Sequence, residues 1–153
     1  MKELRGTAEA SVDAPLATVL SLLEAVDAYP SWYPEVVRRV EVVERDGAGP
    51  PSRVRAQLHI AQGPIARDFE LLMSVAVQRP STVRLARVPR EPTDPERFEV
   101  IWRLNGGERT HISLELLANL DVPRFLPLGG IGDSVARGFA DAAVRRLTAA
   151  ESN

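Results

Sequence analysis

Cysteine is absent from this chain of 153 residues, and aromatic residues make up only 5% of it. The absence of cysteine excludes disulfide bonds, thiol catalysis and metal sites built from thiolates. Lys2 is the only lysine among the 19 basic residues, so arginine carries nearly all of the positive charge. The formal net charge of -2 gives no electrostatic reason to expect binding to nucleic acid or to an anionic membrane.

Long apolar runs are also missing. The chain has no stretch of roughly 18 apolar residues, and its first twelve residues lack the apolar core of a signal peptide. We therefore expect a cytoplasmic protein without integral membrane contact. The length and the 44% hydrophobic content are typical of a single domain, 1–153, that buries its own core.

The periodicity of apolar residues predicts an α+β fold. A strand at 4–12 precedes a helix at 13–26 and a short, broken second helix near 27–35. Alternating patterns then predict strands at 36–45, 53–60, 65–77, 82–88, 98–104 and 110–118, and a long helix follows residue 133. This order indicates a curved antiparallel sheet of about seven strands with the C-terminal helix laid across it.

The three aromatic residues at 29–33 stand out in a chain with so few. Tyr29, Trp32 and Tyr33 occur in the stretch DAYPSWYPEVV, interrupted by Pro30 and Pro34. The prolines should cut the second helix to a turn and direct the chain into the next strand. We expect the aromatic rings to plug one end of the sheet, with the Tyr33 hydroxyl as the group most able to reach an internal cavity.

Several stretches resemble the START-like (SRPBCC) superfamily. The opening SVDAPLATVLSLLEAVDAYPSWYPEVVRRVEVV, the hairpin FEVIWRL with GGERTHISLELL, and the final GDSVARGFADAAVRRL all look like this superfamily. Within it the chain is most similar to the polyketide cyclase/dehydratase and coenzyme Q-binding branches. The resemblance implies a helix-grip fold with two short helices after the first strand. It also implies an apolar cavity between the sheet and the C-terminal helix, which large side chains could alternatively fill.

Pairing the strands backwards from their turns predicts which side chains face this cavity. It places Met73, Arg87, Val100 and Ile112 in one row, and Thr110 beside Trp102. Arg87 is then the charged residue on an otherwise apolar face, and a buried arginine needs oxygen partners. It could anchor a carboxylate, phosphate or enolate of a ligand, or it could reach solvent near the end of its strand.

The predicted ligand-binding residues follow from this face, the aromatic stretch, the loop at 122–131 and the last helix. They are Trp32, Tyr33, Arg67, Phe69, Leu71, Met73, Leu85, Arg87, Phe98, Val100, Trp102, Thr110, Ile112, Phe125, Leu128, Val135 and Phe139. We predict no metal and no cofactor, because His59 and His111 are the only histidines and both fall on the polar side of their strands.

Three functions remain open from the sequence. The first is binding or transport of a hydrophobic small molecule such as a lipid, an isoprenoid quinone or a polyketide. The second is a polyketide aromatase/cyclase or dehydratase, in which Arg87, Tyr33 and Thr110 would be the catalytic candidates. The third is an interaction module that docks a partner, or a second copy of the chain, through the loop at 122–131. The lack of an acid-base pair on the apolar face favours binding.

Overall fold

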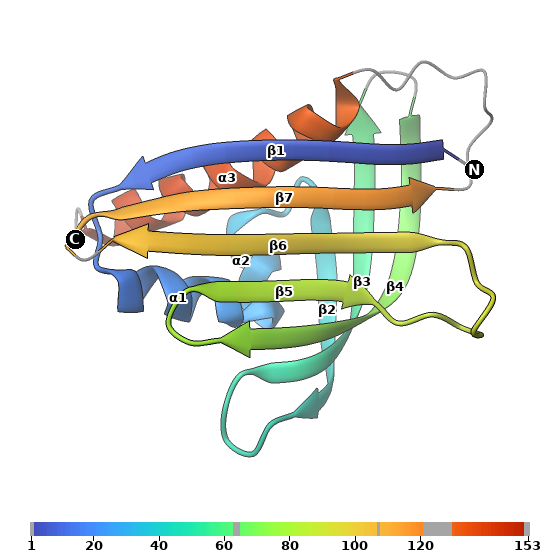
Figure 1. Ribbon diagram of the computed structural model, residues 1–153, viewed down its shortest axis with the longest axis horizontal. Helices are drawn as coiled ribbons and strands as arrows, with labels where there is room; N and C mark the ends of the chain where they lie inside the picture. The colour runs from blue at the N-terminus through green and yellow to red at the C-terminus, as the bar shows by residue number, and fades with distance from the viewer. Residues whose placement is uncertain (1, 63–64, 107, 121–129, 152–153) are drawn as a thin grey trace.

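The fold is a curved antiparallel sheet that wraps around one long helix (Figure 1). A computed structural model describes residues 2–62, 65–106, 108–120 and 130–151. The elements are β1 (Lys2–Val12), α1 (Leu16–Glu24), a 3₁₀ turn η1 (Val26–Ala28), α2 (Tyr29–Trp32), β2 (Val37–Arg45), β3 (Pro51–Gln62), β4 (Ile65–Gln78), β5 (Thr82–Arg87), β6 (Arg97–Gly106), β7 (Thr110–Leu120) and α3 (Ile131–Glu151).

The seven strands are ordered β1-β7-β6-β5-β4-β3-β2, and every neighbouring pair is antiparallel. In Figure 1, β1, β7, β6 and β5 run side by side, whereas β3 turns steeply away from them. Register shifts between β2 and β3 mark bulges, which bend a strand and increase its twist. The predicted α+β helix-grip architecture, with its seven strands and two short helices after β1, is confirmed.

Side chains of alternate residues separate a concave apolar face from a convex charged one. On β7, Ile112, Leu114 and Leu116 are almost fully buried, while the residues between them are half-buried. The helix α3 lies against the concave face and buries Val135 and Phe139 there. The core therefore fills the space inside the curve of the sheet.

The register of the β6–β7 hairpin differs from the prediction. Met73 does lie opposite Arg87, but Val100 pairs with Leu85 rather than with Arg87, and with Leu116 rather than with Ile112. Thr110 lies opposite Gly106, not beside Trp102. The reason is that β6 continues to Gly106, so the turn falls later than the sequence NGGE at 105–108 suggested, and every pair along the hairpin moves with it.

The free edge of β1 is covered by α3. The backbone N–H of Thr7 donates to Asp133 Oδ1 at 3.0 Å, and Arg137 Nη1 donates to the carbonyl oxygen of Glu9 at 3.0 Å. A Cβ at Gly6 would overlap the backbone carbonyl of Gly132, so the two backbones approach as closely as only glycine permits. These hydrogen bonds pair backbone groups at the free edge of β1 and hold α3 across the sheet.

Candidate ligand-binding site

The space between the concave face and α3 contains an apolar cavity of about 30 Å³. A volume of this size accommodates only one or two water molecules, so side chains fill most of the space that the curve of the sheet creates. Its walls come from η1, α2, the strands β2 to β6, and α3. The lining residues are Val26, Tyr29, Val37, Val40, Val54, Ala56, Leu58, Met73, Leu85, Phe98, Val100 and Phe139.

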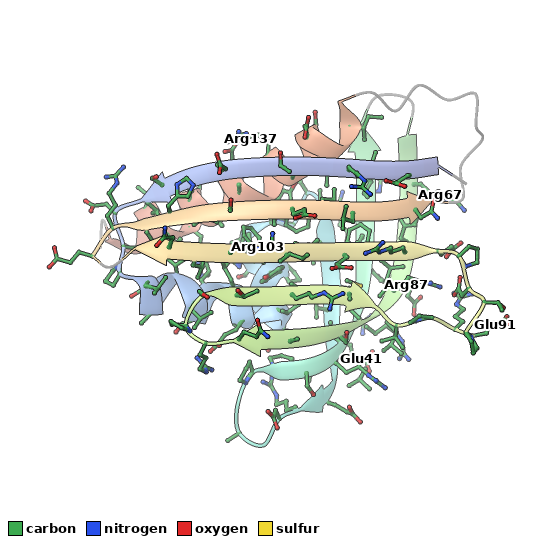
Figure 2. All side chains as sticks on the ribbon, in the orientation of Figure 1. Glu41, Arg67, Arg87, Glu91, Arg103 and Arg137 are labelled. Atoms are coloured by element: carbon green, nitrogen blue, oxygen red, sulfur yellow. The ribbon has the colours of Figure 1, made fainter. Side chains whose placement is uncertain are left out.

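A larger groove, of about 200 Å³, lies at the end of the sheet where β5 ends and β6 begins. Phe98 lines both the groove and the apolar cavity, so the two adjoin. Figure 2 shows Arg67 and Arg87 at this end of the sheet. The groove is lined by Arg67, Asp68, Phe69, Glu70, Leu71, Arg87, Arg90, Glu96, Arg97, Phe98 and Asn119. We call it the mouth groove; its rim is charged and its floor, toward the cavity, is apolar.

Arg87 is buried in this region and is held by groups of the protein itself. Its side chain is 5% exposed, and Nη2 lies 2.9 Å from Asp94 Oδ2 and 3.4 Å from Glu96 Oε2. Nη1 donates to the backbone carbonyl of Glu96 at 2.9 Å. Arg87 therefore pins the loop between β5 and β6 to the concave face, and its need for oxygen partners is met without a ligand.

Asp94 is correspondingly held in its charged form. Hydrogen bonds from the Arg87 guanidinium, and then from the backbone N–H groups of Arg90 and Glu96, lower the pKa of Asp94 to about 2. The backbone N–H groups donate to its two carboxylate oxygens at 3.1 Å each. The side chain of Asp94 thus organises the loop as well as neutralising Arg87.

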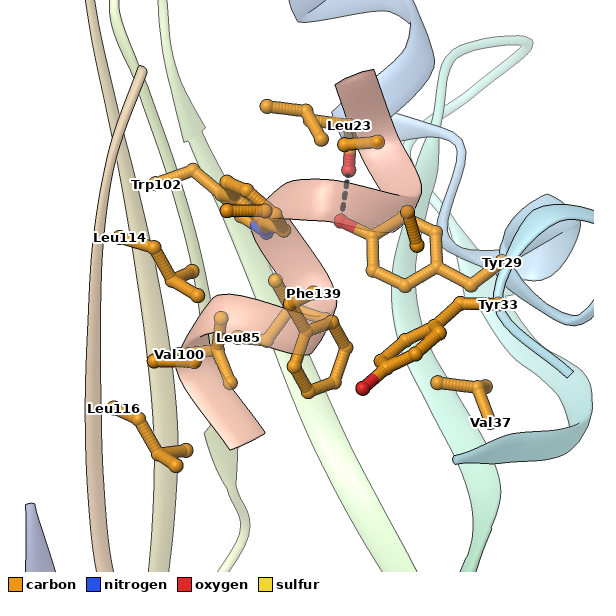
Figure 3. Close-up of a cluster of buried hydrophobic side chains, with 14 of the residues drawn as sticks. Leu23, Tyr29, Tyr33, Val37, Leu85, Val100, Trp102, Leu114, Leu116 and Phe139 are labelled. Atoms are coloured by element: carbon orange, nitrogen blue, oxygen red, sulfur yellow. Dashed lines mark hydrogen bonds between the residues drawn. The ribbon is translucent and has the colours of Figure 1, made fainter. Parts of the chain in front are cut away.

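An aromatic cluster packs between α2 and α3, and two of its members, Tyr29 and Phe139, line the cavity (Figure 3). The ring centroids of Tyr29 and Trp32 are 4.6 Å apart, and those of Tyr33 and Phe139 are 4.7 Å apart in an edge-to-face arrangement. The Tyr29 hydroxyl donates to the backbone carbonyl of Leu23 at 2.6 Å. Burial raises the pKa of Tyr29 far above its usual range. Tyr29 therefore stays a neutral hydrogen-bond donor.

Tyr33 lies against α3 at Gly138, where a Cβ would overlap the tyrosine hydroxyl. Burial raises the pKa of Tyr33 to about 12, and Glu35 and Asp141 add to this rise against the opposing effect of Arg145. The phenol is consequently protonated at neutral pH and has no capacity to act as a base.

Thr110, the third catalytic candidate, is fully buried at the start of β7. Its Oγ1 donates to the backbone carbonyl of Ala14 at 2.8 Å, which ties β7 to the segment between β1 and α1. This hydrogen bond explains a threonine at the start of an otherwise apolar strand face. It gives Thr110 a structural role at the end of the sheet away from the mouth groove.

The structure brings some of the predicted ligand-binding residues together and separates others. Those that line the cavity are Met73, Leu85, Phe98, Val100 and Phe139. Those that line the mouth groove are Arg67, Phe69, Leu71, Arg87 and Phe98. Buried residues outside both linings are Trp32, Tyr33, Trp102, Thr110, Ile112 and Val135. Phe125, Leu128 and most of the loop at 122–131 lie outside the described residues.

Sequence reasoning missed the wall that β2 and β3 contribute. Val54, Ala56 and Leu58 alternate clearly in the sequence, and this alternation was the signal for a concave face. The predicted strand pairing covers β4 to β7 only and does not include these residues. Tyr29 is also absent from the predicted ligand-binding residues, although it lines the cavity.

Two further properties concern the described residues alone. No group of three or more histidines, cysteines or carboxylates among them is arranged to hold a metal ion. None of the described helices combines the length and the apolar character needed to cross a bilayer.

The curved sheet, the long helix and the apolar space between them define a START-like protein with a helix-grip fold. Residues 12–148 match the family described as "Polyketide cyclase / dehydrase and lipid transport", and the chain belongs to this family. No curated protein matches the chain in sequence.

Solved structures confirm the fold at low sequence identity. A START superfamily protein from Mycobacterium smegmatis has a TM-score of 0.76 and 18% identity, covering 95% of this chain and 97% of its own. A protein from Thermus thermophilus has a TM-score of 0.70 and 21% identity, covering 95% and 98%. The Zhui aromatase/cyclase from Streptomyces sp. R1128 has a TM-score of 0.55 and 20% identity, covering 98% and 89%.

Proposed function

We propose that the protein binds a hydrophobic small molecule between the concave face of the sheet and α3. The observation that carries this proposal is the apolar cavity, whose lining contains no histidine, carboxylate or basic residue among the described residues. The mouth groove adjoins it at Phe98 and provides a polar entrance. Pockets that bind small molecules are lined mainly by apolar side chains with only a few polar groups.

The polar side chains on the concave face support binding over catalysis. Arg87 is engaged by Asp94 and Glu96, and Thr110 by the carbonyl of Ala14. Tyr33 stays protonated at neutral pH. An aromatase/cyclase reaction is the second candidate, favoured by the family's description and by the structural likeness to an aromatase/cyclase. It would need one of these three groups to leave its present partners or to change its protonation state.

The small volume of the cavity restricts how a ligand can bind. Sites for small molecules measure roughly 300–1,000 Å³, whereas this cavity measures about 30 Å³. Binding must therefore displace side chains of the cavity wall, and the affinity is reduced by the free energy of that rearrangement. A protein of this kind accepts a ligand by exchanging internal packing contacts for contacts with the ligand.

The test uses the uncharged fluorescent probe N-phenyl-1-naphthylamine and native mass spectrometry of the purified protein. We expect the probe to bind with micromolar affinity and a co-purified apolar molecule to be detected. Ala56 lines the cavity, so Ala56→Val should weaken probe binding at least several-fold by reducing the space. Ala76→Val on the exposed face of β4 is the matched control and should change nothing.

Two results would contradict the proposal. One is the absence of probe binding together with the absence of any co-purified molecule. The other is equal probe affinity in the wild type, Ala56→Val and Ala76→Val, which would place the probe elsewhere on the protein.

A further inference from the structure

The indole N–H of Trp102 is a buried hydrogen-bond donor without an acceptor. Trp102 is 0% exposed, and its Nε1 atom has no hydrogen-bond partner among the described residues. Buried donors in folded proteins are nearly always paired, because an unpaired one loses its hydrogen bonds to water without compensation. The described part of the chain supplies no acceptor for this one.

The side chain of Tyr29 is the polar group that interacts with the Trp102 indole, and its hydroxyl proton is directed elsewhere. It donates to the carbonyl of Leu23 at 2.6 Å. The Trp102 indole opposes the rise in the pKa of Tyr29 that burial causes, but it does not reach the geometry of a hydrogen bond. The Trp102 donor therefore stays available.

Trp102 stands directly behind the cavity wall. It is the next residue after Val100 on the concave face of β6, about 7 Å further along the strand, and Val100 lines the cavity. Its ring centroid lies 6.3 Å from that of Phe139, which also lines the cavity. Figure 3 shows the Trp102 ring extending from β6 toward Tyr29 and Phe139.

Phe139 is the side chain whose movement would join the cavity to Trp102. Its ring packs edge-to-face against Tyr33 at 4.7 Å and against Trp102 at 6.3 Å. A ligand larger than a few atoms has to displace part of the wall, and rotation of one aromatic side chain on α3 does so without moving the backbone. Displacement at this point brings the ligand against the indole.

We propose that the ligand site extends past Phe139 to Trp102, and that the indole N–H donates to an acceptor oxygen at the leading end of the ligand. This inference rests on the proposed function and names the ligand class: an apolar molecule that carries a carbonyl or similar acceptor oxygen at the end that enters first. An apolar molecule without such an oxygen would leave the donor unpaired and bind more weakly.

The experiment compares two probes of nearly the same shape, 2-acetylnaphthalene and 2-isopropylnaphthalene, which differ in the carbonyl oxygen. We expect the ratio of ketone affinity to hydrocarbon affinity to be roughly tenfold higher in the wild type than in Trp102→Phe, since one buried hydrogen bond is gained while the transfer of each probe from water is the same for both proteins. In the same sample the ¹⁵N-labelled indole groups give two N–H resonances, one for each tryptophan. The Trp102 resonance should move downfield with the ketone but not with the hydrocarbon.

Two variants assign the effect to one residue. Trp102→Phe removes the donor and keeps an aromatic ring, so this affinity ratio should fall roughly tenfold. Trp32→Phe removes the other buried indole N–H that lacks a partner among the described residues, and it should keep the affinity ratio of the wild type. The resonance measurement on the wild type keeps the proposal testable even where Trp102→Phe does not fold.

The different failures are distinguishable. An equal affinity ratio in the wild type and Trp102→Phe overturns the role of Trp102 and leaves the proposed hydrophobic site standing. A ratio that falls as far in Trp32→Phe as in Trp102→Phe also overturns the assignment. Failure of both probes to bind contradicts this inference and the proposed function together.

Discussion

The guanidinium of Arg87 and the carboxylate of Asp94 form an ion pair at 2.9 Å in which the side chains are 5% and 10% exposed. The pair joins the concave face of β5 to the loop that borders the mouth groove. A charge buried this deeply is stable only while its partner is present. The buried arginine on the apolar face is thus coupled to the loop of its own chain.

Replacement of Arg87 by leucine should lower the melting temperature, because Asp94 and Glu96 would lose their counter-charge. We expect a decrease of roughly 6–12 °C, as for breaking one buried ion pair in a domain of this size. The triple variant Arg87→Leu, Asp94→Asn, Glu96→Gln removes the carboxylates as well and should recover much of the loss. Thermal unfolding followed by circular dichroism measures both. A fully stable Arg87→Leu protein would show that the pair contributes nothing.

The same pair predicts how stability depends on pH. The pKa of Asp94 is lowered from 3.8 to about 2 in the folded state, so the folded protein binds this proton less readily than the unfolded chain. The contribution of Asp94 to stability is therefore complete above about pH 5 and is lost progressively as the pH falls through 3.8 and on through about 2. Urea unfolding at pH 7, 4, 3 and 2 measures the loss.

Asp94→Asn is the control for this pH dependence. It should be less stable than the wild type at pH 7 and should lose less stability between pH 4 and pH 2. Part of the acid loss remains in the variant, because hydrogen bonds from Arg84 and Arg97 also lower the pKa of Glu99. Parallel curves for the wild type and Asp94→Asn would contradict the assignment.

Gly138 and Tyr33 should be strongly coupled. Alanine at position 138 improves helix propensity by about 1 kcal/mol, but its Cβ would overlap the hydroxyl of Tyr33, whose ring is packed against Phe139. Gly138→Ala should therefore destabilise the wild type by about 1 kcal/mol or more. In a Tyr33→Phe background the overlap with the hydroxyl is gone and only a tight contact with the ring atom Cζ remains, at 3.2 Å, so the same change should cost much less. A double-mutant cycle from urea unfolding measures the coupling, and additive effects would contradict it.

Much of the fold could be predicted because its signals are local. Alternation along β3 to β7 and the prolines around Tyr29 set the strands and the broken helix before any tertiary contact is considered. The hairpin register could not be predicted, because the position of the turn near Gly106 depends on how far β6 continues to pair. A shift of this kind moved Thr110 away from Trp102.

The candidate site was less predictable than the fold. The alternation of apolar residues that includes Met73 and Val100 identified the concave face of the sheet. How far side chains fill the cavity depends on the ring of Phe139 and on the wall that β2 and β3 contribute. The partners of Arg87 come from Asp94 and Glu96 in a loop whose sequence, PREPTDPE, indicates only a turn. The alternation along the strand predicts that Arg87 faces the interior. Only the path of the loop shows which oxygen atoms pair with its guanidinium.

Phe139 fills space between the cavity, Tyr33 and Trp102. Phe139→Ala should destabilise the protein by about 3–5 kcal/mol and should enlarge the cavity. Binding of N-phenyl-1-naphthylamine should become several-fold tighter, because less wall has to be displaced when the probe enters. Fluorescence titration and urea unfolding measure the two effects on the same samples.

Leu147→Ala is the matched control for this prediction. Leu147 is 3% exposed on the same helix but does not line the cavity, so its truncation should destabilise the protein without tightening probe binding. Where Phe139→Ala is too unstable, Phe139→Leu should show both effects at smaller size. Tighter binding in Leu147→Ala equal to that in Phe139→Ala would mean that the probe responds to general loosening of the core, and that Phe139 has no particular part in closing the cavity.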